Sequence, residues 1–220
     1  MTRAFFAIVL RDLRLHATSG GGLLLAPGFF ALVATLFPLA LNPAPATLRL
    51  IAPAVVWIGG LLAVLISLER IFGEDIEDGS LDAMALGLLP LALVALAKAL
   101  GHLVAFGVPL LVTAPLIALA YQLDTATTGK LLLSLLLGLP ALTLIGLFAA
   151  ALTAGLKRAG ALIALIVVPL ELPVLIFGVW SVAAPAGGGQ TGLIYLALIT
   201  LGALILLPAA VGAVLRLVLE

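Results

Sequence analysis

The sequence predicts an all-α integral membrane protein with six transmembrane helices. Of its 220 residues, 65% are hydrophobic and only 9% are charged. A soluble domain is roughly half apolar and about 25% charged, because its surface must face water. The same composition excludes a disordered chain, which would be poor in apolar residues. The apolar runs are continuous and leucine-rich rather than alternating, which favours helices over a membrane β-barrel.

Breaks rich in charge, proline or glycine divide the chain into pieces long enough to cross a bilayer. A helix needs about 20 apolar residues to cross roughly 30 Å of hydrocarbon. Six spans are predicted, at residues 22–42, 50–68, 99–121, 131–156, 159–184 and 192–215. The breaks between them are Asn42–Pro45, Glu69–Asp82, Asp124–Lys130, the Lys157-Arg158 pair and the loop at 185–192.

Residues 83–97 carry no charge, and the distribution of basic residues indicates whether this segment crosses the membrane. With six spans and the N-terminus inside, eight basic residues are cytoplasmic and two, Arg49 and Lys130, are outside. A seventh span at 83–97 would leave five on each side, so the positive-inside rule favours six. Both termini are then cytoplasmic, and residues 83–97 lie on or dip into the interface, with Pro90 bending them.

Residues 1–17 are expected to form an interfacial helix. Its basic side would face the lipid headgroups and its apolar side would face the membrane. A plain basic tail that only sets the topology is the alternative. The two sides are Arg3, Ala7, Arg11 and Arg14 on one, and Phe6, Val9 and Leu13 on the other.

The segment at residues 69–98 is predicted to be a cytoplasmic coupling element between spans two and three. Six of the ten acidic residues fall between Glu69 and Asp82. Asp78 or Ser80 can cap a short helix. An apolar stripe at helical spacing follows, which suits docking on another protein; the alternative is a solvated linker. The candidate docking residues are Glu69, Arg70, Asp75, Asp78, Gly79, Ser80, Leu81, Met84 and Leu88, with Ala85 also in the stripe.

Catalytic and metal-binding motifs are missing from the sequence. It holds no G-x-x-x-x-G-K-[ST] motif, so nucleotide phosphates cannot be bound by a P-loop. With no cysteine and two histidines, a metal site within this chain is not expected. Because ten basic residues balance ten acidic ones, the net charge gives no indication of nucleic acid as a partner, and none is expected.

Three ionisable side chains fall within or beside the predicted spans. Lys98 and His102 stand four residues apart at the start of span three, and Glu171 lies between two prolines in span five. Charged groups at membrane depth are functional candidates by default. The alternatives are a snorkelling anchor for Lys98 and a protonated or hydrogen-bonded packing residue for Glu171. His102 could be an axial haem ligand or donate a hydrogen bond to a backbone carbonyl, and a lone histidine favours the second.

This arrangement resembles the membrane subunits of type 2 ATP-binding-cassette exporters. The detailed match is to the haem exporter permease family, cytochrome c maturation protein B, and it extends over the whole chain. Two departures are Lys157-Arg158-Ala159-Gly160, where the family has two arginines and two glycines, and Glu171, where a neutral or aromatic residue is expected. The matching stretches include Leu68–Phe72, Asp78–Leu81, Pro90-Leu91, Leu96–Lys98, His102, Gly107–Leu110, Gly138–Pro140, Ala150–Arg158 and Pro169–Gly178.

The resemblance implies a non-enzymatic permease subunit in the bacterial inner membrane that acts in c-type cytochrome maturation. Two copies would pair with two copies of a cytoplasmic ATPase subunit and with a haem-handling membrane protein. Haem would be a transported or handled ligand rather than a resident cofactor; whether haem itself moves, or ATP only releases a haem-loaded chaperone, stays open. The rival interpretations are a proton-coupled secondary transporter that uses Glu171 and His102, and a structural assembly factor.

Overall fold

The computed structural model describes residues 1–18, 22–68, 70–156, 159–184 and 188–219, and every regular element in this part of the chain is a helix. Six of its helices are long and apolar enough to cross a membrane, as the sequence predicts. The elements are α1 (Thr2–Thr18), α2 (Gly22–Leu41), α3 (Pro45–Leu68), α4 (Arg70–Glu77), α5 (Ser80–Ala85), α6 (Leu91–His102), a π-helical turn (Leu103–Gly107), α7 (Val108–Ala120), α8 (Thr125–Leu152), α9 (Ala159–Ala183) and α10 (Gly188–Leu219).

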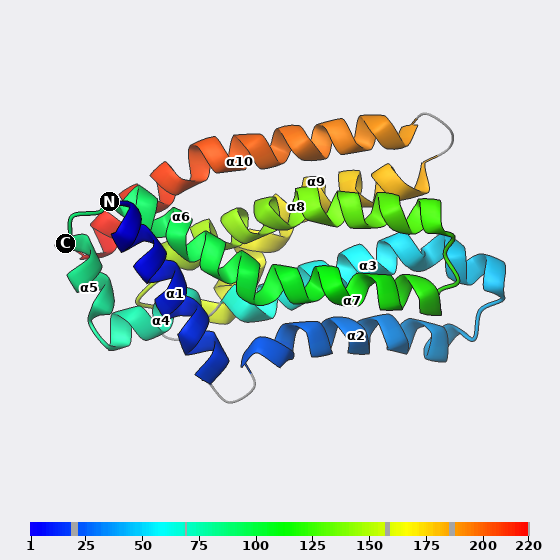
Figure 1. Cartoon of the computed structure of the whole chain (residues 1–220), viewed down its shortest axis with the longest axis horizontal. Coiled ribbons are helices and arrows are strands. Elements are labelled where there is room, and N and C mark those ends of the chain that lie inside the picture. The colour runs from blue at the N-terminus through cyan, green and yellow to red at the C-terminus, as the bar shows by residue number, and fades with distance from the viewer. Residues whose placement is uncertain (19–21, 69, 157–158, 185–187, 220) are drawn as a thin grey trace.

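The six membrane helices run side by side along the long axis of the molecule (Figure 1). Both chain termini lie at one end of this bundle, together with α1, α4 and α5. We call this the polar end. The α2–α3 and α7–α8 connections lie at the opposite end. An even number of crossings returns the chain to the end where it began, which agrees with the predicted placement of both termini on one side.

The third membrane helix begins earlier than the sequence patterns indicate. Helix α5 ends at Ala85, and α6 begins at Leu91, directly after Pro90. Helix α6, the π-helical turn and α7 together form one apolar helix of 30 residues. The expectation of a single interfacial segment over 83–97, with span three starting at 99, therefore does not hold. Proline disfavours helix at the residue before it and fits the start of one, so Pro90 separates two helices instead of bending one.

Close packing at the centre of the bundle depends on two glycines that face one tryptophan. The Trp57 ring of α3 is fully buried, and its indole N–H donates to the Ser134 hydroxyl of α8 at 3.2 Å. A Cβ atom on Gly138 of α8 or on Gly178 of α9 would overlap this ring. The two glycines thus let α8 and α9 approach α3 closely, as small residues do in membrane helix interfaces.

A proline in α2 leaves one backbone carbonyl group without its helical donor, and a side chain distant in sequence donates to it instead. Pro38 has no N–H, so the carbonyl group of Ala34 lacks its usual helical donor. The buried Tyr121 hydroxyl, at the end of α7, donates to this carbonyl at 2.6 Å. Backbone groups cannot turn to water inside a bilayer. This bond therefore lets α2 keep its proline while it packs against α7.

Candidate functional site

The acidic segment after α3 folds into two short helices that turn back on each other at the polar end (Figure 1). We call α4 and α5, residues 70–85, the elbow. Gly79 joins them with a φ of +72°, a left-handed conformation that suits glycine. The Asp78 carboxylate accepts the N–H of Ser80, the first residue of α5, at 2.8 Å. Helix α5 thus begins where the sequence indicated, but the predicted cap by the Asp78 or Ser80 side chain is wrong, because Gly79 occupies the N-cap position and no side chain caps the helix from there.

The predicted apolar stripe is shorter in the structure than the sequence pattern indicates. Leu81 is buried, while Met84 and Ala85 are half-buried against the core. Leu88 lies beyond the end of α5, and its side chain is 92% exposed. The helical spacing that joined Leu88 to the stripe is interrupted, because the chain leaves the helix after Ala85 to reach Pro90.

Lys98 lies in α6 with its side chain buried at the base of the elbow. Its ammonium group donates to the Asp12 carboxylate of α1 and to the Ile71 carbonyl of α4, each at 3.1 Å. It also forms an ion pair with the Asp75 carboxylate and lies 5.6 Å from the centre of the Phe72 ring. Lys98 is therefore a buried joint between α1, α4 and α6 rather than a snorkelling anchor.

Arg11, the residue directly before Asp12 in α1, completes this joint. One guanidinium nitrogen, Nη2, donates to the Asp75 carboxylate at 2.6 Å and to the Ser80 hydroxyl at 2.7 Å. The other, Nη1, donates to Asp12 at 3.3 Å. Burial by itself lowers the pKa of Arg11, but the hydrogen bond and negative charge of Asp75 outweigh it, so the pKa is raised. We call Arg11, Asp12, Asp75, Ser80 and Lys98 the polar network.

The polar network changes the predicted orientation of the N-terminal helix. Arg3 and Arg14 are exposed, as expected of a basic helix face, but Arg11 turns toward the elbow. Val9 is buried, whereas Phe6, expected on the same side, is 62% exposed. The reason is long-range: an isolated helical projection cannot contain Asp75, which lies 64 residues further along the chain. Helix α1 packs on α6 and is fixed there by ion pairs.

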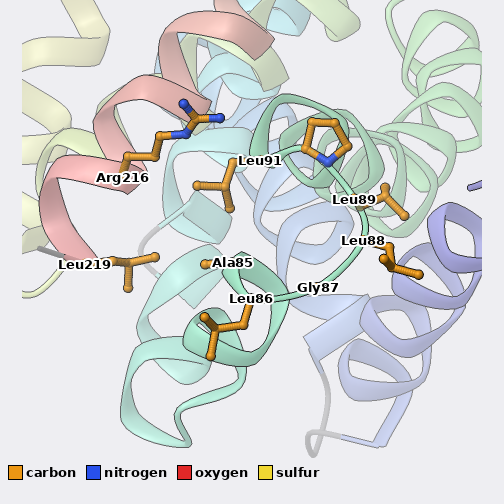
Figure 2. Close-up of a pocket in the computed structure, with 9 residues that line it drawn as sticks. Ala85, Leu86, Gly87, Leu88, Leu89, Leu91, Arg216 and Leu219 are labelled. Atoms are coloured by element: carbon orange, nitrogen blue, oxygen red, sulfur yellow. The ribbon is translucent and has the colours of Figure 1, made fainter.

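The outer surface of the elbow is acidic, and exposed leucines of the loop after α5 lie beside it. Four carboxylate side chains are exposed on it, and Leu86 is 90% exposed just beyond α5. This loop forms one wall of a groove of about 600 Å³, and Arg216 and Leu219 at the end of α10 form the other (Figure 2). This surface offers negative charge and exposed leucines together, which suits a basic protein partner. The four carboxylates are those of Glu74, Glu77, Asp78 and Asp82.

His102 lies one turn deeper along α6 than Lys98 and is buried among three other elements. Its Nε2 atom is 2.7 Å from the Ser67 hydroxyl of α3, and its Nδ1 atom is 3.4 Å from the Thr143 hydroxyl of α8. The ring also lies against Phe106 of the π-helical turn, with 4.8 Å between ring centres. The histidine thus bonds to side chains of two other membrane helices, not to the backbone carbonyl that the alternative interpretation supposed.

Glu171 differs from Lys98 and His102, because the described residues offer it no partner. Its side chain is fully buried in α9. Neither carboxylate oxygen has a hydrogen-bond partner in the part of the chain that the structure describes. The three intramembrane candidates are therefore not brought together as one site.

Several partners in the polar network and around His102 were not identified from the sequence. Asp12 is the one acidic residue before Glu69, and its position within a basic helix was a usable signal for an internal ion pair. Ser67 and Thr143 carried no such signal. Glu69 and the Lys157-Arg158 pair lie outside the described residues, and so does the side chain of Arg70. Their predicted roles remain predictions.

Comparison with known proteins gives a match along nearly the whole chain. Residues 3–218 match the family described as "CcmB protein". The chain is 47% identical over 212 residues to Heme exporter protein B of Paracoccus denitrificans, covering 96% of this chain and 97% of that protein. It is 44% identical to the protein of that name from Pseudomonas aeruginosa, covering 98% of each. For the Escherichia coli K12 protein the identity is 38%, covering 87% and 88%.

Proposed function

The chain belongs to the CcmB protein family, and from this premise we propose that it is the membrane subunit of a haem exporter that serves c-type cytochrome maturation. The observation that carries the proposal is the match to relatives named Heme exporter protein B over nearly their full length. The six apolar helices supply the membrane domain that such a subunit needs. Haem is the cargo in this proposal and not a resident cofactor.

ATP hydrolysis is assigned to a separate partner. The sequence has no P-loop, so a cytoplasmic ATPase subunit would have to supply the energy. The acidic elbow with its exposed leucines is the surface we assign to this subunit, since negative charge and apolar contact together favour a specific complex. The polar end then faces the cytoplasm of a bacterial inner membrane, with both termini inside.

The polar network offers a physical route from the docked partner to the membrane helices. A push on the elbow moves Asp75, which is paired with Lys98 of α6 and with Arg11 of α1. Because the two cations and two anions are largely buried, separating them would leave uncompensated charge. The elbow, α1 and the start of α6 are therefore expected to move as one body. A second copy of the chain, a second ATPase copy and a haem-handling membrane protein would complete the complex.

Co-purification of the ATPase subunit tests the docking surface. The substitutions Asp82→Lys and Asp78→Lys reverse exposed charges on the elbow, and each is expected to reduce recovery of the ATPase at least tenfold without loss of membrane insertion. Asp82→Lys is the cleaner variant, because Asp78 also lies 3.6 Å from Arg11. Lys130→Glu, an exposed charge reversal at the opposite end of the bundle, is the matched control. Unchanged recovery from both elbow variants would contradict the assignment.

A further inference from the structure

Glu171 lies on an otherwise apolar face of α9 that packs inside the helix bundle. Val167, Glu171, Val174 and Gly178 follow one another at helical spacing and are all buried. Gly178 lies directly against the Trp57 ring of α3. The side chains one turn before and one turn after Glu171 on this face are both valines. The carboxyl group therefore enters a packed apolar layer.

In the described parts of the surrounding helices, no buried positive charge compensates this carboxyl group. Helix α9 packs against α3, α8 and α10. In their described parts these helices carry the ionisable side chains Arg49, Lys130, Tyr195 and Arg216, all of them exposed. The buried hydroxyl groups on the described parts of these three helices have other partners. Ser67 and Thr143 bond to His102, Ser134 to Trp57, and Thr200 to the Leu137 carbonyl.

Two prolines flank Glu171 in α9, and neither can donate a backbone hydrogen bond to the surrounding turns of helix. Pro169 and Pro173 have no N–H, so the carbonyl groups of Leu165 and Pro169 lose their usual helical donors. The Glu171 carboxyl group itself has no hydrogen-bond donor among the described residues. In low-dielectric surroundings an isolated carboxylate is far more costly than a neutral carboxyl group. This chemistry calls for a positive ligand.

We propose that Glu171 is a proton-binding site inside the bundle: its carboxyl group holds a proton while α9 is packed, and releases it when α9 separates from its neighbours and water reaches the group. A metal ion is a poorer ligand for this position, because Ca²⁺ or Mg²⁺ needs about six oxygen ligands. The described residues contain no group of three His, Asp or Glu side chains able to hold one. Separation of α9 is thereby linked to the gain or loss of one proton.

Infrared difference spectroscopy on the full chain in lipid nanodiscs tests this proposal at neutral pH. The spectrum of the native protein minus that of Glu171→Gln should contain the C=O stretch of one protonated carboxyl group, and the band should move in D₂O. The matched control is Glu77→Gln, which removes an exposed carboxylate of the elbow. Its difference spectrum should contain carboxylate bands only. Carboxylate bands in place of the C=O stretch for Glu171→Gln would overturn the proposal.

Resistance to unfolding gives a second measurement that does not depend on band assignment. Gln is a neutral residue of the same size, so Glu171→Gln should leave the unfolding midpoint in sodium dodecyl sulfate unchanged if the native carboxyl group is already protonated. A clear fall in the midpoint would show that an ionised carboxylate with a cationic partner has been lost, and would overturn the proposal. If Glu171→Gln fails to insert, Glu171→Asp retains the acid, and its C=O stretch should appear at a shifted position.

Discussion

Lys98 and Glu171 are both ionisable side chains buried in long apolar helices, yet their surroundings are opposite. Lys98 contacts two carboxylates and a backbone carbonyl supplied by α1 and α4. Glu171 has no hydrogen-bond partner among the described residues. Lys98 lies near the polar end, where elements outside the membrane helices reach it. Glu171 lies where α3, α8 and α10 pack around α9 with apolar side chains.

This difference shows that burial alone does not set the role of a charged group in a membrane helix. A buried ion pair contributes little net stability when it forms, but removing one partner leaves the other charge stranded. A neutral acid leaves no charge stranded when it is replaced. Lys98 is therefore expected to be sensitive to a neutral substitution, whereas Glu171 is expected to tolerate one. Substitutions in the polar network test the first expectation, and infrared spectroscopy of Glu171→Gln tests the second.

Lys98→Met is expected to have the largest effect. It removes the cation that Asp12 and Asp75 share and leaves Arg11 as the one cation paired with both buried carboxylates among the described residues. Breaking a buried pair in this way costs about 3–5 kcal/mol of unfolding free energy. Unfolding in mixed micelles, followed by helical circular dichroism, measures the loss. The control Lys130→Met removes an exposed lysine and should change the free energy by less than about 0.5 kcal/mol. Equal losses would show that Lys98 is not a buried joint.

Arg11→Ala is expected to have a smaller and more local effect, and Arg14→Ala is its natural control. Arg11 makes charge-assisted bonds to the elbow, and such bonds contribute about 1.5–3 kcal/mol. Arg14 lies one turn away and is exposed. Cleavage by a glutamyl endopeptidase at Glu74 and Glu77 reports opening of the elbow, and its rate should rise for Arg11→Ala alone. A similar rate for both variants would favour the plain basic tail that the sequence left open.

Some features of this structure follow from local sequence patterns, whereas others depend on contacts between residues far apart in the chain. Hydropathy and the distribution of basic residues predicted six membrane helices, because these properties act over about 20 residues and need no tertiary contact. The local pattern near Asp78 also predicted the start of α5, although the N-cap is Gly79 rather than the predicted Asp78 or Ser80. The pairing of Arg11 with Asp75 joins residues 64 apart, and no local pattern encodes it. The start of α6 at Leu91 depended on Pro90 separating two helices, where an uncharged run suggested one continuous segment.

The smallest effect is expected at the exposed Asp78 carboxylate, where the stability of the start of α5 should depend on pH. Hydrogen bonds from the side chain and backbone of Ser80 lower the pKa of Asp78. A carboxylate with a lowered pKa stabilises the folded protein above its unfolded pKa, about 3.9, and this contribution disappears as the pH falls through the folded value. The start of α5 should therefore keep its protection from hydrogen exchange between pH 7 and pH 5 and lose it only below about pH 4.

Asp78→Asn tests this assignment, because Asn keeps an acceptor for the Ser80 N–H but does not titrate. Hydrogen exchange of α5, corrected for the intrinsic rate at each pH, should lose most of its acid dependence in this variant. Asp124→Asn is the matched control at the opposite end of the bundle, where hydrogen bonds from Thr127 lower the pKa of Asp124. It should alter exchange at the start of α8 and leave α5 unchanged. Loss of protection in α5 already between pH 7 and pH 5 would point to a group with a higher pKa, because a lowered carboxylate pKa cannot produce a transition in that range.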